Sequence, residues 1–582
     1  MSEKNSSNLY TSAPLLLLTP PLGRKIKEIG RVHASWTDVK PISSLPANQQ
    51  IIKTILHHRL GGTFWETDIK IQGSILVCLP PQAENALKMY AAIMKIYEKH
   101  SLIFILPQGF SNNKKFNSKK LSNKILFEST FNPYSIILNI SKVIYYNSNI
   151  NNIVILSSFL KKEIFEFSFD ASIKFVNSSL IAAKSLSLII NNTSYYCPYS
   201  GAPISLYETL NILSEWRSII LKNRTIRACL GMSFWKRERM SEFFSTPNHP
   251  LTFYRTPFTA LNAAKRSKKS IAVWATRIPK GLEKKASKEK ISLFRIEDGF
   301  IRSSGLGSGF LPPASIIADT RGAYYDPAQP SDLEVLLATH PLDADLQERA
   351  LCLIRTILKK NISKYSSGGS SPDLELPIEQ KIILVPGQVA DDLSVKLGGK
   401  EVGSNFELLK RVRKACPTAF ILYRPHPDVD AGHRAGSIPD EDALRFANVI
   451  SREGTMAPLL DRIDEVHTLT SLTGFEALMR GKQVTTYGQP FYAGWGLTTD
   501  RIPLARRTRQ LTMPQLVAAT LLLYPRYIDP FTGLPCGPEL LIERLGEPEL
   551  WKPSLLMRIR RQQGALKKTL IKNARPILQK LR

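Results

Sequence analysis

Apolar runs alternate with helical stretches through the second half of the chain. The apolar runs are short and rich in β-branched residues, as in buried parallel strands, and the stretches between them have the spacing of amphipathic helices. The clearest strand-like runs are residues 382–385, 419–423, 465–468 and 483–487, with helical patterning at residues 405–415 and 472–478. This alternation predicts a doubly wound parallel sheet, in which ligands bind at the carboxyl ends of the strands.

The amino-terminal third repeats part of this pattern with a different composition, since it is rich in Ile, Asn, Ser and Lys. Strand-like residues 74–80 and 102–107 both end at proline, and residues 83–100 between them have helical patterning. Residues 75–82 resemble the stretch that ends at Gln388, and residues 196–203 resemble residues 528–535. We therefore predict a degenerate copy of the later module, although chance similarity between strand-turn segments is an alternative.

The middle of the chain predicts a second strand-and-helix region before a flexible linker. Residues 293–296 form a short strand-like run, and residues 331–358 a helical stretch with Ser331 as N-cap and Glu334 completing a capping box. Residues 366–372 are rich in Ser and Gly and predict a linker between two lobes. The predicted domains are residues 1–213, 214–370 and 371–545, followed by a tail at residues 546–582.

The length and amino-acid composition restrict the class of protein. The 582 residues, 43% hydrophobic and 22% charged, suit a soluble globular protein of about three or four domain-sized units. The six cysteines show no CxxC spacing and favour a reducing cytoplasm. The run of leucines at residues 15–18 is cut short by Pro20 and Pro21, so neither a signal peptide nor a transmembrane segment is predicted.

The formal net charge of +29 favours an anionic partner: nucleic acid, lipid headgroups or an acidic substrate. Residues 551–582 carry many Lys and Arg with interleaved apolar residues and no acidic residue, which predicts a helix lying on an anionic membrane surface. A solvated terminal helix is the alternative. No nucleic-acid-binding motif is recognisable, so that partner is not predicted.

Two acidic pairs follow strand ends. Asp391 and Asp392 come after the strand that Pro386 and Gly387 terminate, together with Gln388. Glu297 and Asp298 follow residues 293–296 and precede Arg302. Both pairs are candidates for acid, base or nucleophile chemistry, while capping of the next helix is the alternative for Asp391 and Asp392.

Cations and hydroxyls follow the later strands. Arg424 and His426 lie beside prolines and suit a phosphate group, although a structural histidine is the alternative. A helix is predicted to begin at Ser471, Thr473 and Gly474, and its first turn could bind an anion. Simple capping of the helix would explain these residues equally well. The Asp-Val-Asp sequence at residues 428–430 resembles a metal motif, but no metal site is predicted because a phosphate can be held there without one.

Six motifs, in order, resemble the capsule polysaccharide biosynthesis family of the KpsC type. They begin at Arg295 (Arg-Ile-Glu-Asp-Gly-Phe-Ile-Arg-Ser), Tyr324 (Tyr-Tyr-Asp), Pro386 (Pro-Gly-Gln-Val-Ala-Asp-Asp), Tyr423 (Tyr-Arg-Pro-His-Pro-Asp), Thr470 (Thr-Ser-Leu-Thr-Gly-Phe-Glu-Ala-Leu) and Gln489 (Gln-Pro-Phe-Tyr-Ala-Gly-Trp-Gly-Leu-Thr). The resemblance covers about residues 225 to 545 and is carried chiefly by the long later motifs.

The resemblance implies a retaining β-Kdo transferase with a GT-B-like fold: two Rossmann-like doubly wound lobes, here preceded by the degenerate α/β module. Residues 214–370 would be the acceptor-side lobe and residues 371–545 the nucleotide-sugar lobe. The implied donor is CMP-Kdo, with no cofactor, and the implied acceptor is an anionic glycolipid built on lysophosphatidylglycerol at the inner face of the bacterial inner membrane. Capsule assembly and export proteins are further implied partners. Residues 1–213 lack counterparts of the acidic and His-Pro motifs and are expected to be non-catalytic.

Retaining transfer by two displacements needs a carboxylate nucleophile and a second group for the acceptor proton. We expect Asp392 to be the nucleophile, with Asp391 second, and Glu297 to be the acid/base, with Asp298 in support. Arg302 or Arg295 would meet the Kdo carboxylate. The other expected substrate-binding residues are Gly387, Gln388, Arg424, His426, Pro427, Ser471, Thr473, Gly474, Glu476 and Tyr492. A transferase for another nucleotide sugar and a non-catalytic assembly scaffold are the alternative functions.

Overall fold

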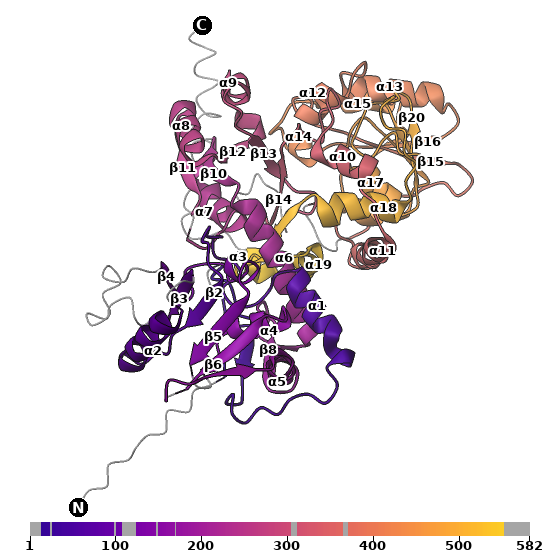
Figure 1. Cartoon of the computed structure of the whole chain (residues 1–582). Helices are drawn as coiled ribbons and strands as arrows, with labels where there is room; N and C mark the ends of the chain where they lie inside the picture. The colour runs from indigo at the N-terminus through magenta and orange to yellow at the C-terminus, as the bar shows by residue number, and fades with distance from the viewer. Residues whose placement is uncertain are drawn as a thin grey trace, which may run out of the picture. The chain divides into compact units, whose positions relative to one another are not determined.

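The chain consists of two compact units (Figure 1). The computed structural model describes residues 13–23, 26–97, 101–107, 124–146, 149–168, 170–248, 250–303, 311–364 and 370–551. The first unit is Met1–Arg224 with Ser245–His249, and the second is Thr225–Phe244 with Pro250–Arg582. The predicted boundary at residue 213 falls inside helix α6 (Leu206–Asn223), which belongs to the first unit. The predicted tail from residue 552 and the core of the linker, residues 365–369, lie outside the described residues.

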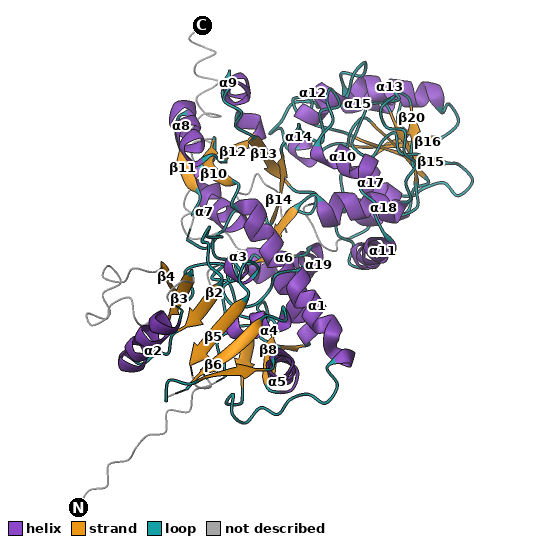
Figure 2. Cartoon of the chain, viewed as in Figure 1, coloured by secondary structure: helices purple, strands orange, loops and turns teal. Residues whose placement is uncertain are grey.

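The first unit is built on a six-stranded sheet of order β4-β3-β2-β5-β6-β7, in which only β7 is antiparallel (Figure 2). Its central strands are almost completely buried, because their apolar residues face helices on both sides. The strands are β2 (Ile75–Cys78), β3 (Leu102–Leu106), β4 (Lys124–Phe127), β5 (Lys142–Tyr146), β6 (Glu163–Phe167) and β7 (Ile173–Val176). The helices are α1 (Gln49–His57), α2 (Ala83–Ile96), α3 (Tyr134–Ile137), α4 (Asn152–Phe159) and α5 (Ser178–Asn191), with a 3-10 turn η1 at Pro46–Asn48.

A small sheet of order β1-β8-β9 completes the first unit and contains the predicted sequence echo. Its strands are β1 (Gly30–Val32), β8 (Thr193–Tyr196) and β9 (Pro203–Ile204). The turn between β8 and β9 pairs Cys197 N–H with the Ala202 carbonyl at 2.8 Å, and Gly201 has a φ of +81°. The hairpin between β21 (Arg526–Ile528) and β22 (Pro535–Cys536) pairs Asp529 N–H with the Leu534 carbonyl at 2.9 Å, and Gly533 has a φ of +72°. The two similar sequences therefore form the same turn, with glycine where the backbone is left-handed.

The first lobe of the second unit has a seven-stranded sheet of order β11-β10-β12-β13-β14-β21-β22. Strands β10 to β13 are parallel, and β14, β21 and β22 run antiparallel to their neighbours. The first five are β10 (Ile226–Leu230), β11 (Thr252–Tyr254), β12 (Ser270–Trp274), β13 (Leu293–Asp298) and β14 (Ser315–Asp319). The helices are α7 (Phe234–Phe243), α8 (Pro257–Ser267) and α9 (Leu282–Lys288), with a 3-10 turn η4 at Ala275–Arg277.

The second lobe has six parallel strands in the order β17-β16-β15-β18-β19-β20. They are β15 (Ile382–Pro386), β16 (Phe420–Arg424), β17 (Val449–Ile450), β18 (Glu465–Thr468), β19 (Gln483–Thr486) and β20 (Thr499–Asp500). The helices are α12 (Leu393–Gly398), α13 (Asn405–Ala415), α14 (Pro427–Asp430), α15 (Asp440–Leu444), α16 (Met456–Asp461) and α17 (Leu472–Met479). The order reverses between β15 and β18, so the crevice for a ligand opens at the carboxyl ends of these two strands.

The chain returns to the first lobe after β20, which differs from the predicted boundary at residue 545. Strand β21 pairs with β14, so residues 526–536 belong to the first lobe's sheet. The elements around the return are α10 (Asp332–Thr339), α11 (Ala344–Lys359), α18 (Met513–Val517), the π-helical segment η6 (Ala518–Leu523), α19 (Pro538–Leu545) and the 3-10 turn η7 (Pro548–Trp551). Sequence pattern could not show this return because a strand's neighbour is set by long-range pairing. The two doubly wound lobes nevertheless confirm the predicted GT-B-like fold class.

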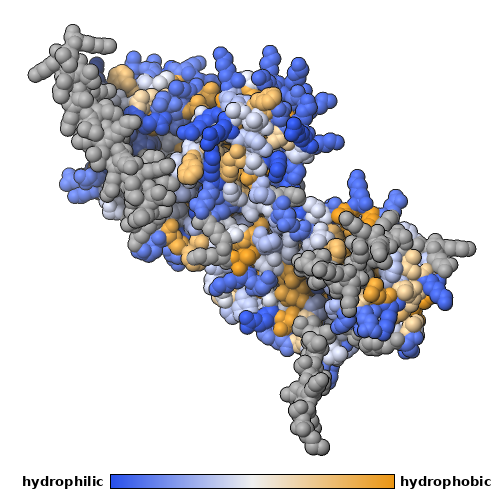
Figure 3. All heavy atoms as spheres, turned by 90° about the vertical axis from the view of Figure 1, so that its left-hand side faces the viewer, coloured by the Kyte–Doolittle hydropathy of each residue, from blue (hydrophilic) through white to orange (hydrophobic). Residues whose placement is uncertain are grey.

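Hydrophilic side chains cover most of the surface seen in Figure 3, and apolar side chains show between them as separate patches. Among the described residues, no helix combines the length and apolar character needed to cross a bilayer.

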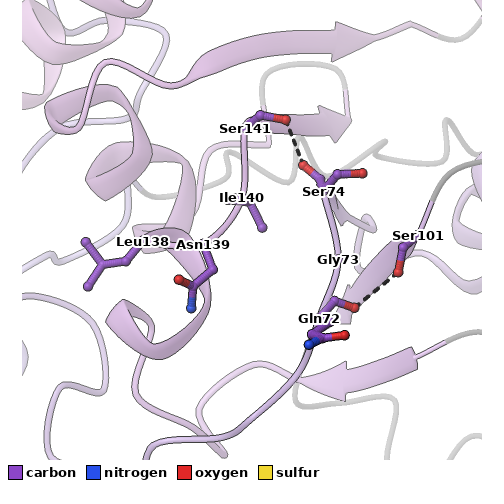
Figure 4. Close-up of a pocket in the computed structure, with 8 residues that line it drawn as sticks. All are labelled: Gln72, Gly73, Ser74, Ser101, Leu138, Asn139, Ile140 and Ser141. Carbon is purple, nitrogen blue, oxygen red and sulfur yellow. Dashed lines mark hydrogen bonds between the residues drawn. The ribbon is translucent and has the colours of Figure 1, made fainter.

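An open pocket of about 470 Å³ lies in the first unit (Figure 4). Its residues Ser74, Ser101 and Ser141 directly precede β2, β3 and β5, so the pocket lies at the amino ends of these parallel strands. Two of the hydroxyls are used internally, Ser101 to the Gln72 carbonyl at 3.1 Å and Ser141 to the Ser74 carbonyl at 3.0 Å. Because open α/β sheets bind ligands at the opposite edge, this pocket does not mark a catalytic site.

Candidate functional site

Gln388 lies at the carboxyl ends of β15 and β18, where the strand order of the second lobe reverses. Its side chain spans the carboxyl ends of β15 and β18: the amide nitrogen donates to Thr470 Oγ1 at 3.0 Å and the amide oxygen accepts from Thr470 N at 3.0 Å. Its own N–H donates to Asn405 Oδ1 at 2.9 Å. Gly387 is needed beside it, because a Cβ there would lie 2.8 Å from the Tyr423 hydroxyl. The predicted residues Gly387 and Gln388 therefore shape the crevice, with Gln388 mostly buried and already hydrogen-bonded.

Asp392 does cap helix α12, which was the alternative to a catalytic role. Its Oδ1 accepts from Ser394 N at 2.9 Å and from the Ser394 hydroxyl at 3.0 Å. The carboxylate is nevertheless exposed, and its charge raises the pKa values of Glu297 and Tyr325. Capping thus occupies one oxygen of Asp392, and the charge of its carboxylate still adds to the raised pKa of Glu297 in the first lobe.

Asp391 is engaged differently. Its Oδ1 accepts from Nη2 of Arg434 at 2.9 Å and from Nε at 3.2 Å. This hydrogen-bonded pair, about half exposed, holds the pKa of Asp391 below its usual value. Of the two adjacent aspartates, Asp392 is the one whose charge adds to the raised pKa of Glu297 in the first lobe.

Glu297 lies at the end of β13 and is the group whose pKa suits acid/base chemistry. Desolvation by burial and then the neighbouring Asp298 raise its pKa from 4.5 to about 7, while Lys236 and Lys364 oppose the shift and Asp392 adds to it. The Tyr325 hydroxyl donates to its Oε1 at 3.5 Å, a long hydrogen bond. A carboxyl group whose pKa is close to neutral pH can both donate and accept a proton efficiently at that pH.

Asp298, the adjacent residue, is held as a carboxylate. Arg302 Nε donates to its Oδ2 at 2.8 Å and Lys236 Nζ lies 3.5 Å from its Oδ1. Although burial alone would raise the pKa of Asp298, these two cations lower it below its usual value. Lys236 itself packs 3.3 Å from the ring centroid of Trp274, and desolvation lowers its pKa to about 8. The predicted supporting role of Asp298 therefore has a definite form: it is the ion-paired neighbour that helps raise the pKa of Glu297.

The expectation that Arg302 or Arg295 meets a substrate carboxylate does not fit the structure. Arg302 is 1% exposed, and its guanidinium also donates to the Ser303 hydroxyl at 2.8 Å and the Leu311 carbonyl at 2.9 Å. Arg295 donates to Glu283 at 2.7 Å and to the Thr320 carbonyl at 3.3 Å. Both cations are therefore occupied, Arg302 by acceptors nearby in sequence and Arg295 by acceptors 12 and 25 residues away.

The guanidinium of Arg424 stabilises a loop, so its N–H donors are already used within the protein and do not point freely toward a phosphate group. Its guanidinium donates to the Glu453 carbonyl at 2.7 Å, the Gly454 carbonyl at 2.6 Å and the Ser451 hydroxyl at 3.2 Å. His426 caps α14, accepting through Nδ1 from Asp428 N at 3.1 Å, and Pro427 is the first residue of that helix. Desolvation lowers the pKa of His426, and the charge of Asp392 reaches its ring. Of these three predicted residues, His426 is the one electrostatically coupled to the crevice.

Helix α17 carries the remaining predicted residues. Ser471 is its N-cap, accepting from Thr473 N at 3.2 Å, and donates its hydroxyl to Thr473 Oγ1 at 3.1 Å. Tyr492 is buried and donates to the Ser471 carbonyl at 2.6 Å. Gly474 allows this contact, because a Cβ there would lie 2.3 Å from the Tyr492 hydroxyl. The capping reading is therefore confirmed, and the helix start stays at the crevice beside Thr470.

Glu476 does not fit the expected contact with ribose. It is 7% exposed and accepts from the backbone N–H of Lys364 at 3.3 Å. Desolvation raises its pKa to about 7, and Arg480 and Lys364 only partly offset this. It lines a small cavity with Phe300, Phe475 and Met479, among others. Glu476 therefore lies on the buried side of α17, where this helix packs against the segment that contains Lys364.

Three residues of this site were not among the predicted site residues: Tyr325, Lys236 and Lys364. Tyr325 stood in the quoted Tyr-Tyr-Asp motif, which could have singled it out. Lys236 follows two aromatic residues at the first helix after β10, where a doubly wound sheet places ligand-binding groups. Lys364 lies next to a predicted linker and had no signal, although its charge acts on Glu297, Asp298 and His426.

Metal ligation gains no support in the described part of the chain. No group of three or more His, Cys, Asp or Glu side chains there could hold an ion. In the Asp-Val-Asp sequence, Asp430 pairs with Arg452 at 2.8 Å. That the protein needs no metal stays a prediction.

Sequence comparisons agree with this architecture. The family model described as "Capsule polysaccharide biosynthesis protein" matches residues 269–371 and 350–527. The capsule polysaccharide modification protein LipA of Neisseria meningitidis serogroup A is 41% identical over 342 residues, 58% of this chain and 48% of LipA. The lipopolysaccharide-processing protein LpsZ of Rhizobium meliloti is 37% identical over 326 residues, 55% of this chain and 74% of LpsZ. The match with LipA thus spans about half the length of that protein.

Two solved structures from Thermosulfurimonas dismutans are also similar. The KpsC β-Kdo 2,7 transferase is 35% identical, with a TM-score of 0.46, over 55% of this chain and 99% of that one. The KpsC β-Kdo 2,4 transferase is 31% identical, with a TM-score of 0.49, over 55% and 98% respectively.

The second unit is a two-lobed α/β protein of the GT-B class, with acidic groups from both lobes facing one crevice. By its similarity to LpsZ over three quarters of that protein, the chain belongs to the capsule polysaccharide biosynthesis protein family.

Proposed function

We propose that the second unit is a retaining glycosyltransferase that moves Kdo from CMP-Kdo to a Kdo-bearing glycolipid in capsule polysaccharide biosynthesis. One observation carries the proposal: Glu297, with a pKa raised to about 7, lies within electrostatic reach of Asp392 from the other lobe. One carboxyl poised for proton transfer and one exposed carboxylate are the two groups that retaining transfer by double displacement requires. The choice of Kdo follows from the six motifs that resemble the KpsC type.

In the first displacement, the Asp392 carboxylate attacks the anomeric carbon of Kdo. The bond from that carbon to the phosphate oxygen breaks, and CMP leaves with the electron pair. In the second displacement, an acceptor hydroxyl attacks the same carbon, Glu297 takes its proton, and the bond to Asp392 breaks. Two inversions at one carbon give net retention. The Ser394 hydrogen bonds hold the attacking carboxylate in place.

The residues near the crevice suggest how the donor is held. The start of α17 would place the positive end of its helix dipole and the hydroxyls of Ser471 and Thr473 toward the phosphate of CMP, and His426 and Lys364 would add donors or positive charge beside it. The acceptor in this proposal is an anionic glycolipid at the inner face of the inner membrane, and capsule assembly and export proteins are its further partners. The first unit has Pro80, Pro81 and Gln82 where the second lobe has Pro386, Gly387 and Gln388 with the two aspartates beyond, and is proposed to be non-catalytic.

The test uses Asp392→Asn, because asparagine also caps helices and keeps α12 intact. Purified wild-type protein with CMP-Kdo and a Kdo-primed glycolipid should form a β-linked product. Asp392→Asn should lose transfer while its thermal unfolding stays like wild type. Asp391→Asn is the matched control, which loses the Arg434 pair only and should keep most of the activity.

Intact mass spectrometry gives a second readout. With CMP-Kdo and no acceptor, the wild-type protein should gain the mass of one Kdo residue on the peptide that contains Asp392. Glu297→Gln should accumulate this adduct even with acceptor present, because the second displacement lacks its base. Wild-type transfer by Asp392→Asn, or a product of inverted configuration, would overturn the proposed mechanism. UDP-linked sugars in place of CMP-Kdo test the alternative donor.

A further inference from the structure

A strongly basic surface lies on the first lobe, on helices α8 and α9 and the residues beside them. Residues 255–290 contain eleven Lys and Arg and only two acidic residues, Glu283 and Glu289. Both acids are already paired, Glu283 with Arg295 at 2.7 Å and Glu289 with Lys265 at 2.6 Å. The excess of positive charge in this short segment is therefore not neutralised locally.

Packing gathers these charges onto one side of the lobe. Ala260 and Ala264 of α8 and Leu282 and Ala286 of α9 are buried in one core cluster with β10, β12 and β13. The two helices therefore lie on the same face of the sheet and turn their other sides outward. The exposed basic residues of this surface are Arg255, Lys265, Arg266, Lys268, Lys280, Lys284, Lys285, Lys288 and Lys290, and we call it the α8/α9 surface. The side of the chain on which α8 lies in Figure 1 faces the reader in Figure 3, where long hydrophilic side chains project.

Two exposed aromatic side chains lie at the carboxyl edge of the sheet, and the one on α8 borders this surface, whereas α7 packs on the opposite face of the sheet. Phe258, in the first turn of α8, is 71% exposed, and Phe234, the first residue of α7, is 72% exposed. The two helices begin directly after β11 and β10, whose carboxyl ends point the same way as that of β13 because the strands are parallel. The aromatic residues thus lie at the same edge of the sheet as Glu297.

We propose that the α8/α9 surface docks on an anionic lipid bilayer, with Phe258 entering the headgroup region. Cationic side chains are attracted to a bilayer of anionic lipids, and an exposed aromatic ring at the edge of a cationic surface adds apolar area that the interface can bury. A glycolipid held in that bilayer would enter the crevice from the edge that carries Glu297. The inference rests on the proposed function only for this last step, since docking itself requires no transfer.

The predicted tail at residues 552–582 is also basic, so the test must resolve position along the chain. Hydrogen–deuterium exchange of the full chain, with and without vesicles of phosphatidylglycerol and phosphatidylethanolamine, gives that resolution. We expect vesicle-dependent protection in peptides covering α8 and α9, and none with phosphatidylcholine vesicles. Absence of protection in α8 and α9 with anionic vesicles would overturn the proposal.

Substitutions give the second measurement. Arg266→Gln, Lys284→Gln and Lys288→Gln together should lower the partition coefficient onto anionic vesicles about tenfold or more. Phe258→Ser should lower it further. The matched control replaces Lys400, Lys410 and Lys414, exposed residues in and beside α13 of the second lobe, with Gln and should leave partitioning close to wild type. An equal loss in the control and the α8/α9 variant would overturn the proposal, as would protection of α8 and α9 by single-stranded RNA but not by vesicles.

Activity separates this inference from the proposed function. The α8/α9 variant should transfer Kdo to a water-soluble Kdo acceptor at the wild-type rate and lose transfer to the same acceptor embedded in vesicles. If the wild-type protein transfers Kdo to neither acceptor, the proposed function fails, while the vesicle measurements still decide the docking surface.

Discussion

Adjacent carboxyl groups in this protein have opposite acid–base properties because their partners differ. Glu297 and Asp298 are neighbours in β13, so their side chains point to opposite sides of the strand. Asp298 meets Arg302 and Lys236, and its pKa falls below the usual value. Glu297 meets mainly burial and the charge of Asp298, and its pKa rises to about 7. The same dipeptide thus supplies a fixed negative charge and a group that can move a proton.

The raised pKa of Glu297 predicts the pH dependence of transfer. As the base of the second displacement, Glu297 must be deprotonated, so the rate should fall as pH decreases through about 7. Glu297→Gln should lower the rate about 10²- to 10⁴-fold and remove this limb of the profile. Steady-state rates between pH 5.5 and 9 with the soluble acceptor, at about half-unit steps, are the measurement. A wild-type profile that is flat across neutral pH would contradict the assignment.

The same shift predicts a stability effect of opposite sign to that of a salt-bridged carboxylate. The pKa of Glu297 is raised in the folded state, so the folded protein binds its proton more tightly than the unfolded chain. Its contribution is therefore favourable at low pH and is lost as pH rises from 4.5 through about 7. Glu297→Gln should be more stable than wild type at pH 8 by about 1 kcal/mol, measured by urea unfolding of the second unit's transition.

At the scale of elements, several of the proposed site residues are the first residues or N-caps of helices. Ser331 caps α10 as predicted, accepting from Glu334 N at 3.1 Å. The predicted capping box is wrong, because the Glu334 carboxylate pairs with Arg506 and Arg507 instead of turning back to the cap. Asp392 and Ser471 likewise begin helices beside the crevice, so the proposed site residues at these positions are also caps. A capping motif in the sequence therefore did not argue against a site.

Helix α17 depends on the small size of Gly474. Gly474→Ala would place a Cβ 2.3 Å from the Tyr492 hydroxyl and force α17 away from the loop that carries Tyr492. We expect a loss of about 1–3 kcal/mol in the free energy of unfolding. Thermal and urea unfolding measure this loss. Gly403→Ala is the matched control, since nothing lies within 4 Å of its Cβ, and it should stay within about 0.5 kcal/mol of wild type.

On the scale of the whole molecule, one buried carboxylate joins segments far apart in sequence. Glu334 in α10 is 7% exposed and accepts from Arg507 Nη2 at 2.9 Å and Nε at 3.1 Å, as well as from Arg506. Arg507 also donates to the Pro490 and Ala493 carbonyls at 2.6 and 2.8 Å. The aromatic motif that begins at Gln489 is thereby attached to α10 through Arg507.

Removing Glu334 should destabilise the second unit strongly, because the buried Arg507 would be left without its carboxylate, and the more exposed Arg506 would lose the same partner. Glu334→Ala should lower the free energy of unfolding by about 3 kcal/mol or more. Glu539→Ala is the comparison: its partner Arg349 lies 2.7 Å away but both side chains are more than 40% exposed, so the loss should be below about 1 kcal/mol. Urea unfolding of both variants at pH 7 gives the comparison, and equal losses would contradict it.

The sequence by itself determined the elements and the chemistry at their ends. Apolar runs that end at turn residues predicted β13, β15, β16 and β18, because strands depend largely on local pattern. The acidic, cationic and hydroxyl residues that follow these strands predicted the position of the crevice. Contacts between distant segments decided the rest: that β21 returns to the first lobe, that Arg295 is already bound to Glu283 and the Thr320 carbonyl, and that Glu476 is buried. Whether the pKa of a carboxyl lies near neutral pH depends on burial and on the charges around it. The sequence supplies Asp298 next to Glu297, but only the tertiary structure buries Glu297 and brings Lys236, Lys364 and Asp392 near it.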